Sequence, residues 1–169
     1  EISACLVGSE MCIRDSMPSF FPDAFLSSVP RGTALVGLDI GAKTIGVAVS
    51  DTLWLTATPL KTVFRKSFQY DMNELSALLK GREIGGFISG LPLQMNGEEG
   101  PQAAYTREQG EKIAAYFQKP VYFQDERLSS AAVERVMIGT YDMSRKKRKE
   151  RLDAGAAAFI LQSFLDRIR

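Results

Sequence analysis

The sequence predicts an α/β fold in which a mixed five-stranded sheet is flanked by helices. Two patterns predict it: short β-type segments open the main part of the chain, and helical periodicity then alternates with short apolar runs. Size adds a third observation, because 169 residues with 45% hydrophobic content enclose one core but not two sizeable ones. We therefore expect a single domain over residues 34–169.

The segment before that domain is predicted to lie outside the fold. Residues 1–16 begin with Glu1 where a signal peptide carries basic residues, and their apolar run is too short for one. They resemble translated sequencing-adaptor sequence, so we interpret them as a non-native leader and Met17 as the natural start. Residues 17–33 contain several proline and serine residues, which favours a flexible lead-in.

The predicted sheet begins with a β-hairpin. Ala34 to Asp39 is a short apolar run, Thr44 to Ser50 is rich in β-branched residues, and Gly41-Ala-Lys43 lies between them. A third strand within Leu55 to Arg65 would complete an antiparallel meander. Asp39 therefore lies at the end of the first predicted strand.

Helices and strands are predicted to alternate after the meander. Asp71 with Glu74 is typical of a helix cap, and apolar residues follow at helical spacing up to Gly81. The remaining predicted elements are a buried strand at 84–89, a loop at 90–97, a helix at 101–118, a strand at 121–124, a helix at 129–137 and a terminal helix from about 151 to 168. This order matches the ribonuclease H-like architecture.

Composition excludes several classes of site. The chain has no histidine, which removes Ser-His-Asp and Cys-His catalysis and zinc sites with imidazole ligands. Both cysteines lie in the first dozen residues without metal-ligand spacing or a disulfide framework, which fits a reducing, cytoplasmic location. No apolar stretch approaches the ~20 residues that span a bilayer, so we expect no membrane partner. The net charge of +1 does not by itself indicate a nucleic-acid partner.

A single carboxylate, Asp39, interrupts the apolar hairpin. Burying an unpaired charge is costly unless a partner compensates for its lost hydration, and a bound cation is one such partner. A carboxylate at the end of a strand suits a hard cation such as Mg²⁺, which prefers oxygen ligands. The alternative is that Asp39 is an exposed carboxylate of the hairpin with no function.

Two more carboxylates, Asp125 and Glu126, follow the short strand at 121–124. Adjacent strand residues point to opposite faces, so only one of the two can easily face Asp39. If one strand separates them from Asp39, the gap is roughly 9 to 10 Å, which the longer Glu126 bridges more readily. We slightly prefer Glu126 as the metal ligand. In the alternative, Asp125 caps the following helix and Glu126 pairs with Arg127.

Asp153 begins a run of small residues that would allow the terminal helix to pack closely on the sheet. Its alternative role is to stabilise the helix dipole from the first turn. Together with Asp39 and the Asp125-Glu126 pair, Asp153 makes three sources of carboxylate. Such a set can hold one or two divalent ions and activate water for phosphodiester cleavage without histidine.

Basic residues supply candidate phosphate contacts. Lys43 lies in the hairpin turn, where Gly41 would let the backbone approach a phosphate. The only concentrated basic run lies shortly before Asp153 and consists of Arg145, Lys146, Lys147, Arg148 and Lys149. Phosphate binding there would depend on salt and little on sequence, whereas a solvated loop explains such a run equally well.

Four motifs resemble, in the same order, the signatures of the YqgF/RuvX family, and the resemblance covers roughly Ala34 to the C-terminus. The motifs are Leu38-Asp-Ile-Gly-Ala-Lys-Thr-Ile-Gly-Val47, Gly90-Leu-Pro-Leu-Gln-Met-Asn-Gly97, Gln124-Asp-Glu-Arg-Leu-Ser-Ser130 and Asp153-Ala-Gly-Ala-Ala157. Members of this family are Holliday-junction-resolvase-like nucleases that are associated with maturation of the 16S rRNA precursor.

The resemblance implies a metal-dependent endonuclease acting on structured RNA or branched DNA, with Mg²⁺ or Mn²⁺ as cofactor. It favours the 16S rRNA precursor over a recombination junction as substrate, and it leaves a homodimer possible. The metal ligands that it implies are Asp39, either Asp125 or Glu126, and Asp153, and the motif does not say which of the two adjacent acids binds the metal. With the preference for Glu126 given above, we expect Asp39, Glu126 and Asp153 as ligands and Asp125 as a further catalytic residue. The residues implied for binding the nucleic-acid backbone are Lys43, Arg127 and the basic run 145–149.

Two other classes of function remain open. The strand that ends at Gly90 lacks the acid that junction resolvases of this superfold carry near that position, which weakens the nuclease interpretation. A non-catalytic nucleic-acid-binding factor would keep the basic run and the glycine loops and would tolerate loss of the carboxylates. The segment Asp39-Ile-Gly-Ala-Lys43 also suggests the phosphate hairpin of sugar-kinase and actin-like phosphotransferases. Those proteins need two related lobes to enclose ATP, whereas this chain supplies one.

Overall fold

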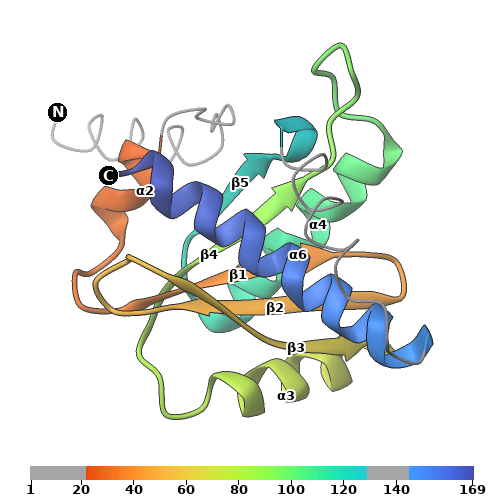
Figure 1. Cartoon of the computed structure of the whole chain (residues 1–169), viewed down its shortest axis with the longest axis horizontal. Helices are drawn as coiled ribbons and strands as arrows, with labels where there is room; N and C mark the ends of the chain where they lie inside the picture. The colour runs from red at the N-terminus through yellow and green to blue at the C-terminus, as the bar shows by residue number, and fades with distance from the viewer. Residues whose placement is uncertain (1–21, 129–144) are drawn as a thin grey trace, which may run out of the picture.

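The computed structural model describes residues 22–128 and 145–169. Its strands are β1 (Ala34–Ile40), β2 (Thr44–Ser50), β3 (Ala57–Phe64), β4 (Ile84–Leu91) and β5 (Val121–Asp125). Its helices are α2 (Asp23–Ser28), α3 (Phe68–Leu79), α4 (Pro101–Phe117), the short 3-10 helix η1 (Glu126–Leu128) and α6 (Arg145–Arg167). Figure 1 shows that α6 crosses the sheet formed by the strands.

The strands lie side by side in the order β3-β2-β1-β4-β5. The first three pair antiparallel, whereas β4 pairs parallel with β1, and β5 pairs parallel with β4. The parallel pairs are possible because α3 and α4 carry the chain back along one face of the sheet. This mixed sheet of five strands is the ribonuclease H-like architecture, so the predicted fold class is confirmed.

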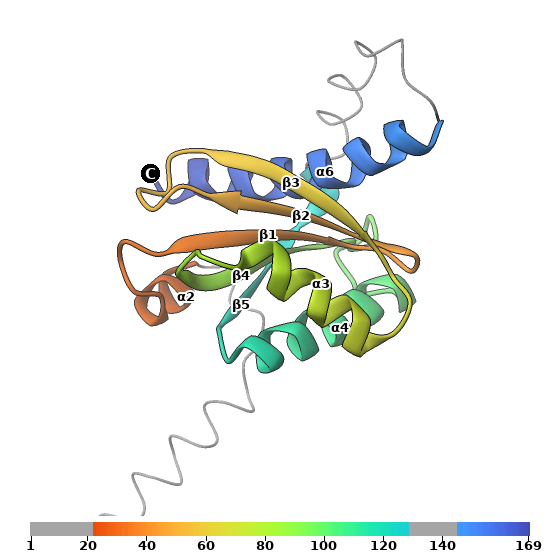
Figure 2. The ribbon, with the colours of Figure 1, turned by 90° about the horizontal axis from the view of Figure 1, so that it is seen from below.

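Helices cover both faces of the sheet, with α6 on one side and α3 and α4 on the other (Figure 2). Alternate residues of β1 face these two layers. Leu35 packs in the same cluster as Phe164 of α6, whereas Val36 and Leu38 pack in the cluster that includes residues of α3 and α4. Because side chains alternate along a strand, Asp39 points to the same face as Leu35, toward α6.

Two glycines allow α6 to lie directly on the sheet. A Cβ atom added to Gly37 of β1 would lie 2.6 Å from the carbonyl oxygen of Ala157. One added to Gly46 of β2 would overlap the carbonyl oxygen of Asp153. Neither site has room for a side chain, so larger residues would push the helix away. The close packing predicted for the small-residue run of the terminal helix is therefore confirmed.

The start of α3 differs from the sequence prediction. Ser67 is the N-cap, and its hydroxyl accepts a hydrogen bond from the Tyr70 amide at 3.3 Å. Asp71, which was expected to cap this helix, is buried within its first turn, with 2% of its surface exposed. Its carboxylate pairs with Arg65 instead, so the capping prediction is wrong.

The terminal helix also begins earlier than predicted. It starts at Arg145, so the basic run 145–149 lies in its first turns rather than in a loop. Asp153 is then about two turns from the helix start, too far inside for the predicted first-turn dipole role. At the other end of the chain, residues 23–28 of the predicted flexible lead-in form α2, whose Phe25 is buried in the core.

Two further predictions concern residues that the structure does not describe. The leader at 1–16 and the helix at 129–137 both lie outside the described ranges. Within those ranges, none of the helices combines the length and the hydropathy that crossing a bilayer requires.

Candidate active site

Asp39 lies between two glycines of neighbouring strands. Antiparallel pairing places Gly46 of β2 opposite it. On the other side, Leu38 pairs with Ser89 of β4, so the next residue of β4, Gly90, lies beside Asp39. Residues paired across a sheet point to the same face, so both glycines open space next to the Asp39 carboxylate on the face toward α6.

Asp153 of α6 lies over the first of these glycines. Its carbonyl oxygen lies where a Gly46 side chain would begin, which places this turn of the helix directly beside Asp39. Burial, and then the negative charge of Asp153, raise the pKa of Asp39 from 3.8 to about 6. The two carboxylates therefore repel each other when both are ionised.

Glu126 lies over the second glycine. A Cβ atom added to Gly90 would overlap Oε1 of Glu126. Burial, followed by the charges of Asp39 and Asp125, raises the pKa of Glu126 from 4.5 to about 7. β4 has no room for an acidic side chain at Gly90, and a carboxylate from η1 occupies that space instead. The missing strand acid that weakened the nuclease interpretation is thus replaced in space by Glu126.

Asp125 is engaged elsewhere. Its Oδ1 accepts a hydrogen bond from the Arg127 amide at 2.9 Å, and its carboxylate pairs with the Arg127 guanidinium at 2.5 Å. Hydrogen bonds from Arg127 hold the pKa of Asp125 below its ordinary value. β4 lies between β1 and β5, as the argument for the longer Glu126 required. Of the two adjacent acids, Glu126 is the one whose pKa responds to Asp39.

The oxygens of Asp39, Glu126 and Asp153 are of the type that binds a divalent cation. All donors are carboxylate oxygens, which suit Mg²⁺ or Mn²⁺, and Oδ2 of Asp153 is buried without a hydrogen-bond partner. Among the described residues, no three His, Cys, Asp or Glu side chains are already close enough together to hold an ion. The set therefore fits an ion that keeps water ligands, as Mg²⁺ usually does, rather than a fully chelated one.

The predicted phosphate contacts come from three separate segments of the chain. Lys43 is exposed in the turn between β1 and β2. In the sheet, β4 lies between β1 and β5, and Glu126 follows β5. Arg127 is exposed but paired with Asp125, and it also donates to the Met95 carbonyl of the β4–α4 loop at 3.5 Å. The run 145–149 precedes Asp153 along α6, and its side chains lie outside the described part of the structure.

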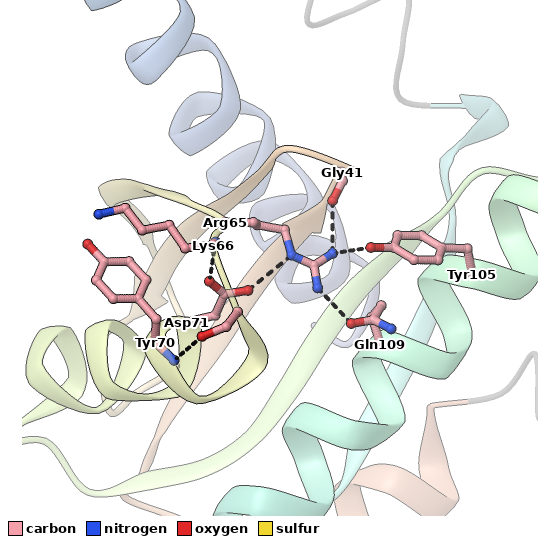
Figure 3. A network of polar contacts seen from close by, with 8 residues as sticks. Gly41, Arg65, Lys66, Tyr70, Asp71, Tyr105 and Gln109 are labelled. Carbon is pink, nitrogen blue, oxygen red and sulfur yellow. Dashed lines mark hydrogen bonds and ion pairs between the residues drawn. The ribbon is translucent and has the colours of Figure 1, made fainter.

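A network around Arg65 was not identified from the sequence. Arg65 donates to Asp71 at 3.1 Å, to the Gly41 carbonyl at 3.1 Å and to Gln109 of α4 at 2.7 Å, and it also contacts the Tyr105 hydroxyl (Figure 3). The contact with Gly41 fixes the turn that follows Asp39. The short spacing between Arg65 and Asp71, across the start of a helix, was the one available signal in the sequence.

Comparison with known proteins finds a matching family model and relatives over most of the chain. The family model described as "RuvX: Holliday junction resolvase" matches residues 33–167. A protein of Rhodobacter capsulatus named "Putative pre-16S rRNA nuclease" is 49% identical over 146 residues, which cover 86% of this chain and 91% of that protein. A protein of Rhodospirillum rubrum with the same name is 45% identical over 150 residues, covering 89% and 93%.

Among solved structures, Thermus thermophilus RuvC in complex with a Holliday junction substrate matches with a TM-score of 0.47 and 18% identity, covering 80% of this chain and 96% of that one.

The family match spans the whole sheet and all the carboxylates described above. The four sequence motifs that resemble the family lie within this match and contain Asp39, Gly90, Glu126 and Asp153. The resemblance found in the sequence is confirmed, and the chain belongs to the RuvX family.

Proposed function

We propose that this protein is a metal-dependent endonuclease that hydrolyses phosphodiester bonds in the maturation of the 16S rRNA precursor, in the cytoplasm. The observation that carries the proposal is the convergence of Asp39, Glu126 and Asp153 on one face of the sheet, between two glycines. The names of the relatives support this substrate, and membership of a nuclease family supports this class of reaction.

Asp39, Glu126 and Asp153 would hold Mg²⁺ or Mn²⁺. When bound, such a cation activates water and stabilises the charge that develops on the phosphate and the leaving oxygen. The oxygens of the three carboxylates lie in a largely buried place, where the repulsion between them favours binding of a cation. Because the pKa values of Asp39 and Glu126 are raised, cation binding near neutral pH would displace protons from them.

Basic residues around the cluster would bind the nucleic-acid backbone. Lys43 is exposed beside the end of β1 and can reach solvent-borne phosphate without breaking an ion pair described here. Arg127 is paired with Asp125, so a phosphate would have to share its guanidinium. The run 145–149 would add charge at the start of α6. These contacts carry little sequence information, so substrate shape would decide the cleavage position.

A second candidate function is cleavage of branched DNA. The description of the matching family as a Holliday junction resolvase favours it. The same carboxylates would serve, since the chemistry at phosphorus is common to RNA and DNA. The homodimer allowed by the family resemblance bears on this choice, because a two-fold dimer suits a symmetric junction, and sedimentation of the pure protein tests it.

The experiment compares cleavage of a precursor 16S rRNA fragment and a four-way DNA junction, with and without Mg²⁺ or Mn²⁺. The wild-type protein should cleave the RNA only with the cation, and Asp39→Asn should bind the RNA without cleaving it. Asp166→Asn is the matched control, because this aspartate is exposed on α6 and the substitution is the same. Cleavage by Asp39→Asn at the wild-type rate would refute the proposal. Cleavage of the junction alone would favour the DNA alternative.

A further inference from the structure

Two buried side-chain oxygens in the described residues have no hydrogen-bond partner: Oδ2 of Asp153 and Oε1 of Gln124. The first belongs to the carboxylate cluster. The second belongs to a residue of β5 that is only 6% exposed and has no role in the site described so far. Buried polar atoms are nearly always paired in native proteins, so an unpaired amide oxygen indicates that a bound group is expected there.

Strand register places Gln124 in the same row as the carboxylates. Gln124 pairs with Gly90 of β4, and Gly90 in turn lies beside Asp39 of β1. Residues paired across a sheet point to the same face, so the Gln124 side chain lies on the face toward α6. The Glu126 carboxylate occupies the space over Gly90, between Asp39 on one side and Gln124 on the other.

The chemistry of the amide suits this position. Three carboxylates already repel one another here, and a fourth would add to the repulsion when no cation is bound. An amide oxygen is a hard donor that binds Mg²⁺ or Mn²⁺, directly or through a water ligand, without adding negative charge. It also cannot be protonated in the physiological range, so it remains available as a donor at every pH of interest.

We propose that the amide oxygen of Gln124 is a fourth oxygen donor of the cation site, on the β5 side of Glu126. This inference rests on the proposed function, since it needs a cation at the carboxylates. It assigns to Gln124 a role in cation affinity that its neighbours on β5 do not share. Tyr122, the preceding residue on the same face, packs on Phe25 and Phe164 and belongs to the core.

The test measures Mn²⁺ binding to the full chain by electron paramagnetic resonance, without substrate. Gln124→Met keeps the length of the side chain and removes the oxygen, so Mn²⁺ should bind roughly tenfold more weakly. Gln124→Glu keeps an oxygen and should bind Mn²⁺ at least as tightly as the wild type. Gln69→Met is the matched control, because Gln69 is exposed on α3 and bonds only to Asn73 among the described contacts.

The outcomes separate this inference from the proposed function. Wild-type affinity in Gln124→Met, together with loss of Mn²⁺ binding in Asp39→Asn, would overturn the role of Gln124 and leave the cation site standing. Absence of Mn²⁺ binding in the wild type would overturn both. If Gln124→Met does not fold, weaker Mn²⁺ binding by Gln124→Glu would still overturn the inference, and equal or tighter binding would support it.

Discussion

Among the described residues, charged side chains are buried on both faces of the sheet, and the groups that surround them differ. On the α3 and α4 face, Asp71 pairs with Arg65, whose guanidinium also bonds to Gly41 and to residues of α4 (Figure 3). On the α6 face, burial and then the charges of neighbouring carboxylates raise the pKa of Asp39 and that of Glu126.

The Arg65 network has a structural role, whereas the role that we propose for the carboxylate cluster is functional. Each described bond of the Arg65 network joins elements that must stay together, namely β3, α3, α4 and the turn after β1. The carboxylate cluster joins elements as well, but its like charges oppose that assembly, and the cation that we propose there would relieve the repulsion. Sites that perform chemistry commonly reduce stability in this way.

The comparison predicts opposite effects of the same substitution in the two regions. Asp39→Asn should reduce cation-dependent cleavage by roughly 10²-fold or more, because a ligand of the reacting centre is lost. In the absence of divalent cations, its free energy of unfolding should equal or exceed that of the wild type, since repulsion with Asp153 is removed. Cleavage rates and urea denaturation of the two proteins measure both effects. A clear loss of stability would contradict the account.

Asp71→Asn should do the reverse. The substitution leaves Arg65, whose side chain is 13% exposed, without its buried counter-charge. Breaking such a pair from one side typically costs about 3 kcal/mol of unfolding free energy. Urea denaturation should show this loss, and cation affinity should stay close to that of the wild type. An unchanged free energy of unfolding would mean that the network is not structural.

Substitutions at the two glycines beside Asp39 should differ in their effects on cleavage and on stability. In Gly90→Ala, the new methyl group meets the flexible end of Glu126, so the carboxylate should move and cleavage should fall about tenfold or more. In Gly46→Ala, the methyl group meets the backbone of α6 at Asp153, which cannot yield as easily. Thermal denaturation should therefore show a larger stability loss for Gly46→Ala, of about 1–3 kcal/mol. Equal losses of stability would contradict this reading of the contacts.

The free energy of unfolding should fall as pH rises through the range in which Asp39 and Glu126 ionise. Acidic groups with lowered pKa values have the opposite effect. The pKa values of Asp39 and Glu126 are raised to about 6 and about 7, so the folded state holds more protons than the unfolded chain at intermediate pH. Their contribution to stability is fully present below the unfolded pKa values and is lost as pH rises toward 7. Urea denaturation at several pH values, without divalent cations, should show this fall, and it should be smaller in the double variant Asp39→Asn, Glu126→Gln.

Much of this arrangement could be predicted from the sequence, because it follows from local patterns. The order of strands, the position of Asp39 at the end of β1, and the close packing of the small-residue run all rest on periodicity and residue size. The preference for Glu126 over Asp125 followed from its longer side chain, which bridges the gap of one intervening strand more readily. The raised pKa of Glu126 and the pairing of Asp125 with Arg127 agree with that preference.

The rest depends on contacts between distant parts of the chain. The role of Asp71 could not be predicted because its partner Arg65 is fixed by Gln109 and Tyr105, which lie on α4. The replacement of a β4 acid by Glu126 needs the register of β4 and β5, which residue types alone do not specify. The role predicted for the run 145–149 stays a prediction, since the described structure gives its backbone alone.

The proposed cation site on the α6 face links binding of a divalent cation to the stability of the fold. The most direct test is the free energy of unfolding at pH 8 with and without 10 mM-scale Mg²⁺, measured for the wild type and for Asp39→Asn; a cation at roughly 100 times its dissociation constant stabilises by about 2.7 kcal/mol. Mg²⁺ should stabilise the wild type and should have little effect on Asp39→Asn. Equal stabilisation of both proteins, or of neither, would contradict the proposed site.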